Sequence, residues 1–200
     1  MISYLDTLDK EILIWIHQYF SNSVFDILMP FITNEENWIF LIALLIIFLA
    51  FRLGKKGKIT LGLLILSLSL TDIICAQILK PFFERLRPSH LNLEGLNLLV
   101  PKGGKWSMPS NHAANIFSFA VILSYFYNNY KYSLFGLALL IAFSRIYVGV
   151  HYLGDVISGA LIGYCISWCV LTLWVILKMR ELKRGKTWVW YQKEPPVFKF

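Results

Sequence analysis

Charged residues are scarce in this sequence. Aspartate, glutamate, lysine and arginine make up 16% of its 200 residues, whereas hydrophobic residues make up 57% and the mean hydropathy is +0.59. This composition is too apolar for a soluble domain of this size and is typical of an integral membrane protein. A second, soluble domain would have no room, so we expect a single membrane domain over residues 1–200.

Cysteine is scarce as well, and several common site motifs are missing. All three cysteines (Cys75, Cys165 and Cys169) fall inside apolar runs. This placement favours small core residues over a disulfide framework or a zinc site. The sequence has no glycine-rich phosphate loop followed by Lys-Ser/Thr and no internal repeat. We therefore expect neither a metal ion nor a cofactor.

Long apolar runs, by contrast, are frequent. A helix that crosses a bilayer needs roughly 17 to 25 apolar residues. Four runs approach or reach this length, namely residues 37–54, 59–79, 132–150 and 153–179. A fifth, residues 113–127, has a shorter apolar core with tyrosines and asparagines behind it, as at a membrane interface. Five crossings are predicted, which put the two termini on opposite sides of the membrane.

The first 36 residues differ from the apolar runs because Asp6, Asp9, Lys10 and Glu11 are mixed with apolar side chains. This pattern predicts an interfacial amphipathic helix, and no signal peptide is expected because acids precede the apolar part. A sixth crossing around residues 25–32 is left open. The predicted fold is thus an all-α, polytopic membrane bundle of five to six transmembrane helices with an N-terminal interfacial helix. Its parts are an interfacial segment (1–36), a transmembrane core (37–179) and a basic cytoplasmic tail (180–200).

The orientation follows from the 19 basic residues, which give a net charge of +7. Twelve of them fall on one side of the predicted topology, and the positive-inside rule assigns that side to the cytoplasm. Aromatic residues in the tail indicate anchoring to anionic lipid, so no nucleic-acid partner is expected. The twelve are Arg52, Lys55, Lys56, Lys58, Lys131, Lys178, Arg180, Lys183, Arg184, Lys186, Lys193 and Lys199.

Three polar stretches fall on the opposite, outer side: "KPFFERLRP" from Lys80, "PSNH" from Pro109, and "SRIYVGVHYLGD" from Ser144. Basic residues near the hydrocarbon boundary are costly unless a counter-charge is present. Few acidic residues accompany Lys80, Arg87 and Arg145, so a phosphate group would complete the site. The alternative is a solvated basic loop.

The same stretches carry two histidines. His151 and Asp155 are one helical turn apart, so the carboxylate can hold one ring nitrogen and leave the other free to attack phosphorus. His112 follows Ser110 and Asn111, either of which is a natural N-cap, and can protonate a leaving oxygen beside the free N–H groups of a helix start. A lone histidine at a helix end is more often structural, but two that converge on an anion site indicate catalysis.

With these residues in place, the chain resembles the type 2 phosphatidic acid phosphatase (PAP2) superfamily of membrane lipid phosphatases. The family's motifs are a lysine separated by six residues from Arg-Pro, then Pro-Ser-Gly-His, then Ser-Arg, five residues, His, three residues and Asp. The sequence departs from them at one position, because Asn111 replaces the glycine. The matching residues are Lys80, Arg87 and Pro88; Pro109, Ser110 and His112; and Ser144, Arg145, His151 and Asp155.

The resemblance implies a metal-independent phosphatase that works through a phosphohistidine on His151. It implies that His112 is the general acid and that Asp155 orients His151. Asn111 can still offer its backbone N–H to the phosphate, while its side chain adds a donor or narrows the pocket. The phosphate-binding residues implied are Lys80, Arg87, Ser110, Asn111 and Arg145.

The expected activity is hydrolysis of a lipid phosphate or diphosphate at the outer leaflet of the plasma (inner) membrane, with the site facing the periplasm or cell exterior. Candidate substrates are undecaprenyl diphosphate, phosphatidylglycerol phosphate, phosphatidic acid and lipid A 1-phosphate. A lipid-to-lipid phosphotransferase and a non-catalytic carrier of anionic lipids are the alternatives. The sequence leaves the oligomeric state open.

Overall fold

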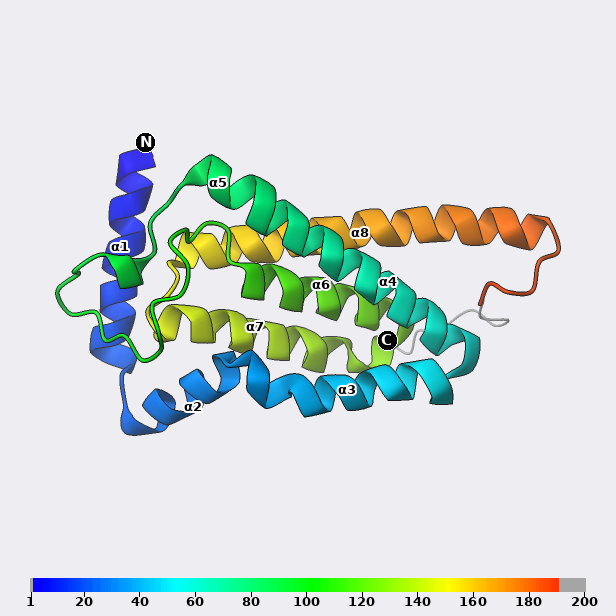
Figure 1. The fold of residues 1–200 in the computed structure, drawn as a ribbon, viewed down its shortest axis with the longest axis horizontal. Helices are drawn as coiled ribbons and strands as arrows, with labels where there is room; N and C mark the ends of the chain where they lie inside the picture. Colours follow the sequence, from blue (N-terminus) through cyan, green and yellow to red (C-terminus); the bar gives the residue numbers. More distant parts are fainter. Residues whose placement is uncertain (1, 191–200) are drawn as a thin grey trace, which may run out of the picture.

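The computed structural model describes residues 2–190, whose regular structure is helical (Figure 1). Within that part of the chain the only β-structure is an isolated bridge between Leu86 and Trp106, so the predicted all-α class is confirmed. Two π-helical segments, Phe48–Arg52 and Ile73–Leu79, prolong α3 and join α4 to α5. The α-helices are α1 (Ile2–Phe20), α2 (Ser23–Thr33), α3 (Ile39–Ile47), α4 (Gly54–Asp72), α5 (Lys80–Phe83), α6 (Asn111–Phe126), α7 (Lys131–Tyr147) and α8 (Leu153–Lys183).

Two continuous helices are long and apolar enough to cross a membrane: Gly54–Phe83, with 30 residues, and Leu153–Lys183, with 31. Helix α2 and the segment Glu35–Arg52 pass the same test only as a pair, bent by 70°. Helices α6 and α7 have 16 and 17 residues. The protein is therefore an integral membrane protein, while the count of five to six spans and the interfacial location of α1 stay predictions.

Helix α3 shows why the surroundings must be lipid. Its sequence, IFLIALLII, is apolar on every face, yet none of its residues is buried. Phe40 is 76% exposed and Ile39 is 62% exposed. Exposed apolar surface on this scale is unfavourable in water by roughly 25 cal/mol for each Å². A bilayer removes that cost, and a helix satisfies its own backbone hydrogen bonds there.

Helix α6 is the central helix and packs against α4, α7 and α8. Three fully buried serines join it to two of these neighbours. The hydroxyl of Ser118 on α6 lies 2.8 Å from that of Ser67 on α4 and 2.8 Å from that of Ser167 on α8. Such interhelical hydrogen bonds satisfy polar groups that have no water available. They fix how α4, α6 and α8 sit relative to one another.

Two glycines let α8 approach α6 at very short range. A Cβ atom at Gly163 would collide with the backbone carbonyl of Ala114, and one at Gly159 would collide with the carbonyl of Ser110. Small residues at a helix contact allow the two backbones to touch. The contact at Gly159 holds the start of α6 against the first turns of α8.

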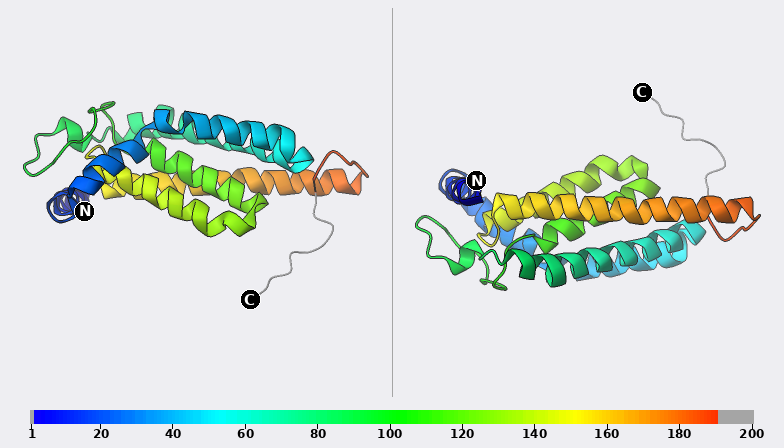
Figure 2. Two further views of the ribbon diagram at one scale, coloured as in Figure 1. Left: turned by 90° about the horizontal axis from the view of Figure 1, so that it is seen from below. Right: turned by 90° about the horizontal axis from the view of Figure 1, so that it is seen from above.

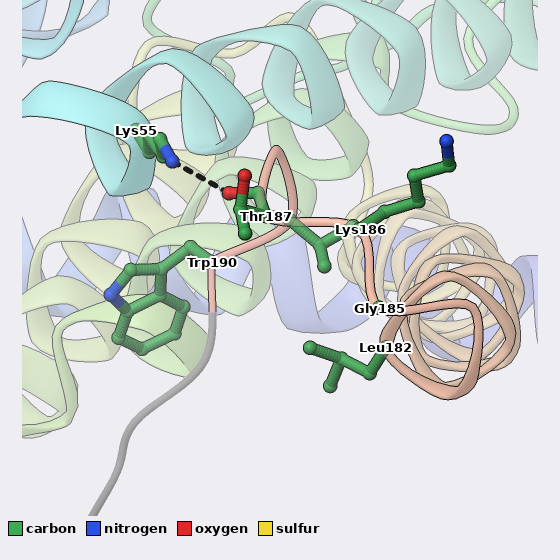
Figure 3. A pocket seen from close by; sticks show the side chains of 7 residues that line it. Lys55, Leu182, Gly185, Lys186, Thr187 and Trp190 are labelled. Atoms are coloured by element: carbon green, nitrogen blue, oxygen red, sulfur yellow. Dashed lines mark hydrogen bonds between the residues drawn. The ribbon is translucent and has the colours of Figure 1, made fainter.

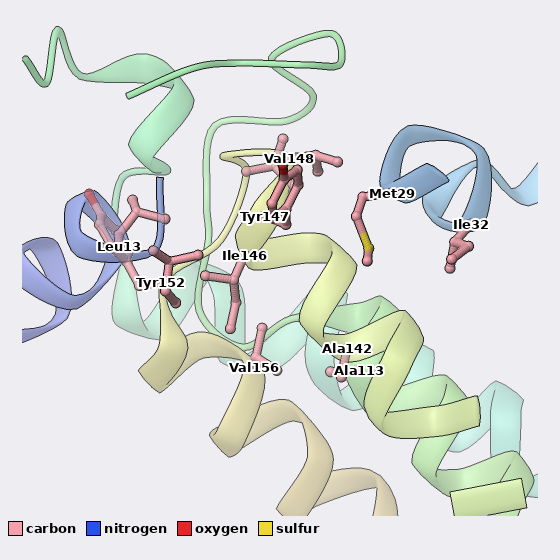
Figure 4. Close-up of a cluster of buried hydrophobic side chains, with 12 residues drawn as sticks. Leu13, Met29, Ile32, Ala113, Ala142, Ile146, Tyr147, Val148, Tyr152 and Val156 are labelled. Carbon is pink, nitrogen blue, oxygen red and sulfur yellow. The ribbon is translucent and has the colours of Figure 1, made fainter. Parts of the chain in front are cut away.

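Helix α1 runs across one end of the bundle, roughly perpendicular to the long helices (Figures 1 and 2). A cluster of buried apolar side chains fixes it there together with α2 (Figure 4). Leu13 of α1 and Met29 of α2 belong to this cluster, along with Ile146 and Tyr147 of α7. The N-terminal segment is thus packed onto the end of the bundle where α7 gives way to α8.

The opposite end carries the described part of the basic tail. Residues 184–190 fold back beside the start of α4, where the ammonium group of Lys55 donates to the backbone oxygen of Thr187 at 2.6 Å (Figure 3). A cavity of about 390 Å³ lies there, lined by Gly185 and Trp190 among others. Helix α8 continues to Lys183, so the tail begins slightly later than residue 180. This end lies far from α1 (Figure 1).

Candidate active site

The three sequence motifs meet at the end of the bundle that α1 crosses (Figure 1). The first motif begins at Lys80, directly after the π-helical segment Ile73–Leu79. Segments of π-helix are rare in proteins, and those that occur are often found at functional sites. The helix stops at Glu84, whose φ of 47° is left-handed, and the chain then turns toward Arg87 in extended conformation. Lys80 and Arg87 are thereby carried to the same end of α4.

A loop from the second half of the 91–110 connection holds Arg87. The side-chain Nε of Arg87 donates to the carbonyl of Trp106 at 3.1 Å, and its backbone N–H donates to the carbonyl of Lys105. Its guanidinium group lies against Gly103, which has a φ of +69° and no side chain to obstruct the contact. Arg87 is 9% exposed. The guanidinium is therefore held in one direction by the loop.

The second motif forms the start of α6. Ser110 is fully buried and its hydroxyl caps the helix by accepting from the N–H of Ala113 at 3.5 Å. Its own N–H donates to the backbone oxygen of Asp155 at 2.9 Å, which ties the second motif to the third. The side-chain amide of Asn111 donates to Asp72 of α4 at 2.8 Å. Asn111 thus directs its side chain toward a neighbouring helix, and a contact with phosphate would have to use its backbone.

The third motif spans the connection from α7 to α8. Arg145 lies in the last turn of α7, His151 lies in the connection, and Asp155 lies in the first turn of α8. Nδ1 of His151 is 3.4 Å from Oδ2 of Asp155, which also accepts the N–H of Tyr152 at 2.9 Å. His151 and Asp155 are 1% and 0% exposed. The aspartate is fixed by the backbone and faces the imidazole, as the sequence spacing predicts.

The basic side chains of all three motifs are close enough for their charges to act on one another. Lys80 is within electrostatic range of Arg87 and Arg145, and His112 is within range of all three and of His151. Arg145 donates from Nη1 to Thr33 at 2.6 Å, while its buried Nε has no partner among the described residues. Like charges gathered at low exposure repel one another unless an anion lies between them. The arrangement is therefore suited to a phosphate group.

Burial sets the protonation state of His151. The ring has almost no contact with water, and this burial lowers the pKa of His151 below its ordinary value, because a charged imidazolium loses its hydration there. Asp155 opposes the shift, while Arg87 and Arg145 add to it. His151 is consequently a neutral imidazole near pH 7, with one nitrogen facing Asp155 and the other available as a lone-pair donor.

The structure adds three contacts that the motifs do not contain. Glu35, at the break between α2 and α3, places a carboxylate oxygen 2.9 Å from Nε2 of His112. Thr33, two residues earlier, accepts a hydrogen bond from Arg145. Arg85 binds Asp155 at 2.9 Å instead of pairing with a neighbour in its own loop. Only Arg85 had a signal in the sequence, because it stands inside the first motif; Thr33 and Glu35 reach the site through packing alone.

Residues 2–190 contain no group of three histidine, cysteine or acidic residues arranged to hold a metal ion. The carboxylates of Asp6, Asp9 and Asp155 are each paired with Arg85. The absence of a cofactor remains a prediction from the sequence.

Known proteins are similar to the chain in sequence and in fold. Over 158 residues the chain is 28% identical to the lipid A 4'-phosphatase of Porphyromonas gingivalis, covering 76% of this chain and 66% of that protein. The lipid A 4'-phosphatase of Bacteroides thetaiotaomicron is 29% identical over 175 residues, with 84% and 77% covered. The crystal structure of Aquifex aeolicus LpxE aligns with a TM-score of 0.66 at 32% identity, covering 81% of this chain and 93% of that one.

The family match covers most of the transmembrane core. Residues 60–179 match the PAP2 superfamily, and this range contains every motif residue described above. The curated relatives named here are phosphatases by name, as the motifs predict. The chain belongs to the PAP2 superfamily.

Proposed function

We propose that this protein is a membrane-integral lipid phosphatase that cleaves a phosphate monoester or diphosphate through a phosphohistidine on His151. One observation carries the proposal: three basic side chains from two separate motifs converge on a buried His–Asp pair at one end of a membrane helix bundle. An anion site alone would suffice for binding. A carboxylate that orients a neutral imidazole is what nucleophilic attack requires.

The proposed reaction has two steps. The unprotonated nitrogen of His151 attacks phosphorus while Asp155 accepts a hydrogen bond from the other ring nitrogen. Lys80, Arg87 and Arg145 neutralise the phosphoryl oxygens, and N–H groups at the start of α6 add donors. His112 gives its proton to the departing lipid oxygen. A water molecule then attacks the phosphohistidine and passes a proton to His112, which restores both histidines and releases inorganic phosphate.

The relatives and the position of the site support a phosphorylated membrane lipid as the substrate. Two relatives that cover three quarters or more of this chain are lipid A 4'-phosphatases, so a phosphorylated lipid A is the first candidate. The exposed apolar helices around the bundle offer lipid access from the bilayer. Undecaprenyl diphosphate, phosphatidylglycerol phosphate and phosphatidic acid are the further candidates.

We place the site at the outer face of the plasma (inner) membrane. The basic residues near Lys55 and in the described tail gather at the other end of the bundle, and the positive-inside rule assigns that end to the cytoplasm. Anionic lipids are the expected neighbours of that basic end.

Phosphate release by purified protein tests the proposal. The protein is incubated with lipid A, undecaprenyl diphosphate, phosphatidylglycerol phosphate or phosphatidic acid in detergent, with excess EDTA. We expect release from at least one lipid and complete loss of release with His151→Ala. Loss of phosphate from the substrate with its transfer to another lipid, and no free phosphate, would indicate the phosphotransferase alternative. Lipid binding without any cleavage would indicate the carrier alternative and contradict the proposal.

A further inference from the structure

Arg85 stands two residues before Arg87, but it does not join the basic side chains of the proposed phosphate site. Its side chain pairs with acidic residues. Nη1 of Arg85 lies 2.9 Å from Oδ1 of Asp155 and 2.8 Å from Oδ2 of Asp9. Nη2 lies 2.9 Å from Oδ1 of Asp6. One guanidinium group thus joins three carboxylates, two from α1 and one from the start of α8. The side chain is 17% exposed, so these contacts are largely shielded from water.

The two carboxylate oxygens of Asp155 have different partners. Oδ1 accepts from Arg85 and lies 3.4 Å from the hydroxyl of Ser107, whereas Oδ2 accepts from the backbone of Tyr152 and faces His151. A carboxylate held at both oxygens cannot rotate about its Cβ–Cγ bond without losing a charge-assisted hydrogen bond. Arg85 therefore keeps Oδ2 directed at the imidazole.

Arg85 is itself fixed on its other side. Its guanidinium group lies 4.1 Å from the ring centre of Tyr152, which is 1% exposed. Burial works to lower the pKa of Arg85, but Asp155, Asp9 and Asp6 outweigh burial and raise it above its usual value. The arginine is thus a permanent cation with its planar group pinned between a buried ring and three carboxylates.

Helix α1 is bound to the same place by a second contact. Oδ1 of Asp9 accepts the N–H of Gly154 at 2.9 Å, in the first turn of α8. A Cβ atom at residue 154 would collide with the Asp9 carboxylate, so glycine is what permits this approach. A carboxylate at the N-terminus of a helix is favoured by the free N–H groups and the helix dipole. Asp9 therefore ties α1 to the turn that carries Asp155.

The acids of α1 also limit what Arg85 can reach. Asp6 is shared with Lys10, at 2.6 Å, and is 38% exposed, whereas Asp9 is 14% exposed. These two carboxylates fix the guanidinium group from the side of α1. With them, it stays on Asp155.

We propose that Arg85 is a positioning residue that holds Asp155 toward His151, and that Asp6 and Asp9 of α1 hold Arg85 in place. This inference rests on the proposed phosphohistidine mechanism. Arg85 does not contact the phosphate; it acts through Asp155. Helix α1 is accordingly part of the catalytic apparatus and not only a membrane anchor.

The first test separates positioning from binding and from folding. Arg85→Gln is expected to lower kcat on a soluble aryl phosphate by about 10- to 100-fold while KM stays within about twofold, and Arg85→Lys is expected to recover part of kcat. Arg184→Gln makes the same substitution at an exposed arginine, which pairs with Glu181 at the far end, and should leave kcat and KM unchanged. A rise in KM at constant kcat would assign Arg85 to phosphate binding and overturn the proposal.

A double-mutant cycle tests the route through Asp155. In an Asp155→Asn background, adding Arg85→Gln should lower kcat by less than about twofold, because the oxygen that Arg85 directs no longer carries its charge. Losses that multiply would show independent roles and contradict the proposal. Should Arg85→Gln not fold, Arg85→Lys takes its place in the same cycle.

Asp9→Asn tests whether α1 holds Arg85 in place. The variant should lower kcat by about three- to tenfold. In the Arg85→Gln background, the same change should lower kcat by less. An unchanged kcat for Asp9→Asn would remove α1 from the mechanism. The proposed function fails separately, if the wild-type protein releases no phosphate from any lipid or aryl phosphate. If the wild-type protein releases phosphate and Arg85→Gln keeps the full kcat, only the inference on Arg85 is contradicted.

Discussion

Nε2 of His112 lies 2.9 Å from a carboxylate oxygen of Glu35, which stands at the sharp break between α2 and α3. The contact joins the proposed general acid to a segment outside all three motifs. Thr33, in the same segment, binds Arg145. The break between the two helices therefore forms one wall of the site, and its side chains are placed to affect both proton transfer and phosphate binding.

Glu35→Gln tests whether this carboxylate assists the acid. A negative charge beside His112 favours its protonated form, so the variant should lower kcat/KM for a lipid monophosphate. Glu35 is 79% exposed, and exposed ion pairs are worth at most about 1 kcal/mol, which limits the loss to about fivefold. Glu36→Gln removes the same charge from the adjacent position and serves as the control. An increase in kcat/KM with Glu35→Gln would mean that the carboxylate only repels the anionic substrate.

His112 should matter most when the leaving group is poor. The alkoxide of a lipid monophosphate needs a proton as it departs, whereas an activated aryl phosphate leaves without one. We expect His112→Ala to lose about 10²- to 10⁴-fold in kcat on the lipid monophosphate and far less on the aryl phosphate. His151→Ala should lose activity on both. Equal impairment of the His112 variant on both substrates would leave it a binding or structural role only.

The pH profile should reflect the burial of His151. A protonated imidazole has no lone pair to attack phosphorus, so activity is lost as the pH falls through the pKa of His151. Since burial lowers that pKa below 6.5, kcat/KM for an aryl phosphate, corrected for ionisation of the substrate, should hold its plateau below pH 6.5. A decline centred at or above pH 6.5 would mean that the attacking group is not a buried histidine.

The orientation in the membrane can be determined with a single cysteine in the loop that contacts Arg87. Gly104 has a negative φ and open space around it, whereas a side chain at Gly103 would strike Arg87. In a variant without the three native cysteines, Gly104→Cys should react with a membrane-impermeant thiol reagent in intact cells. Lys58→Cys, at the far end, should react only after lysis. The reverse pattern would put the chemistry in the cytoplasm.

Much of the fold and site follows from short-range sequence patterns. Apolar runs give helices in lipid, and His151 and Asp155 are close because they are four positions apart in the chain. Helix ends were less accurate: the run predicted at 59–79 is part of a helix over Gly54–Phe83. Lysines near its first turn can extend their charged ends to the membrane surface, so charge did not mark the true helix start.

The rest of the site depends on packing between distant segments. The sequence predicts that Asp6 and Asp9 lie on the polar side of an interfacial helix. In the structure they contact Arg85, about 80 residues away in the chain. Glu35 and His112 are likewise far apart in sequence. No periodicity encodes such pairs, because they depend on the angle at which α1 crosses the bundle and on the bend after α2.

The most direct measurement concerns the covalent intermediate. Purified protein is mixed rapidly with a lipid phosphate, quenched in alkali, where phosphohistidine survives, and analysed by mass spectrometry. Phosphate should be found on His151 in the wild-type protein, increased in His112→Ala with an aryl phosphate because water attack lacks its base, and absent from His151→Ala. Turnover by the wild-type protein with phosphate on another residue, or with no phosphoprotein at any time before the steady state, would contradict the mechanism.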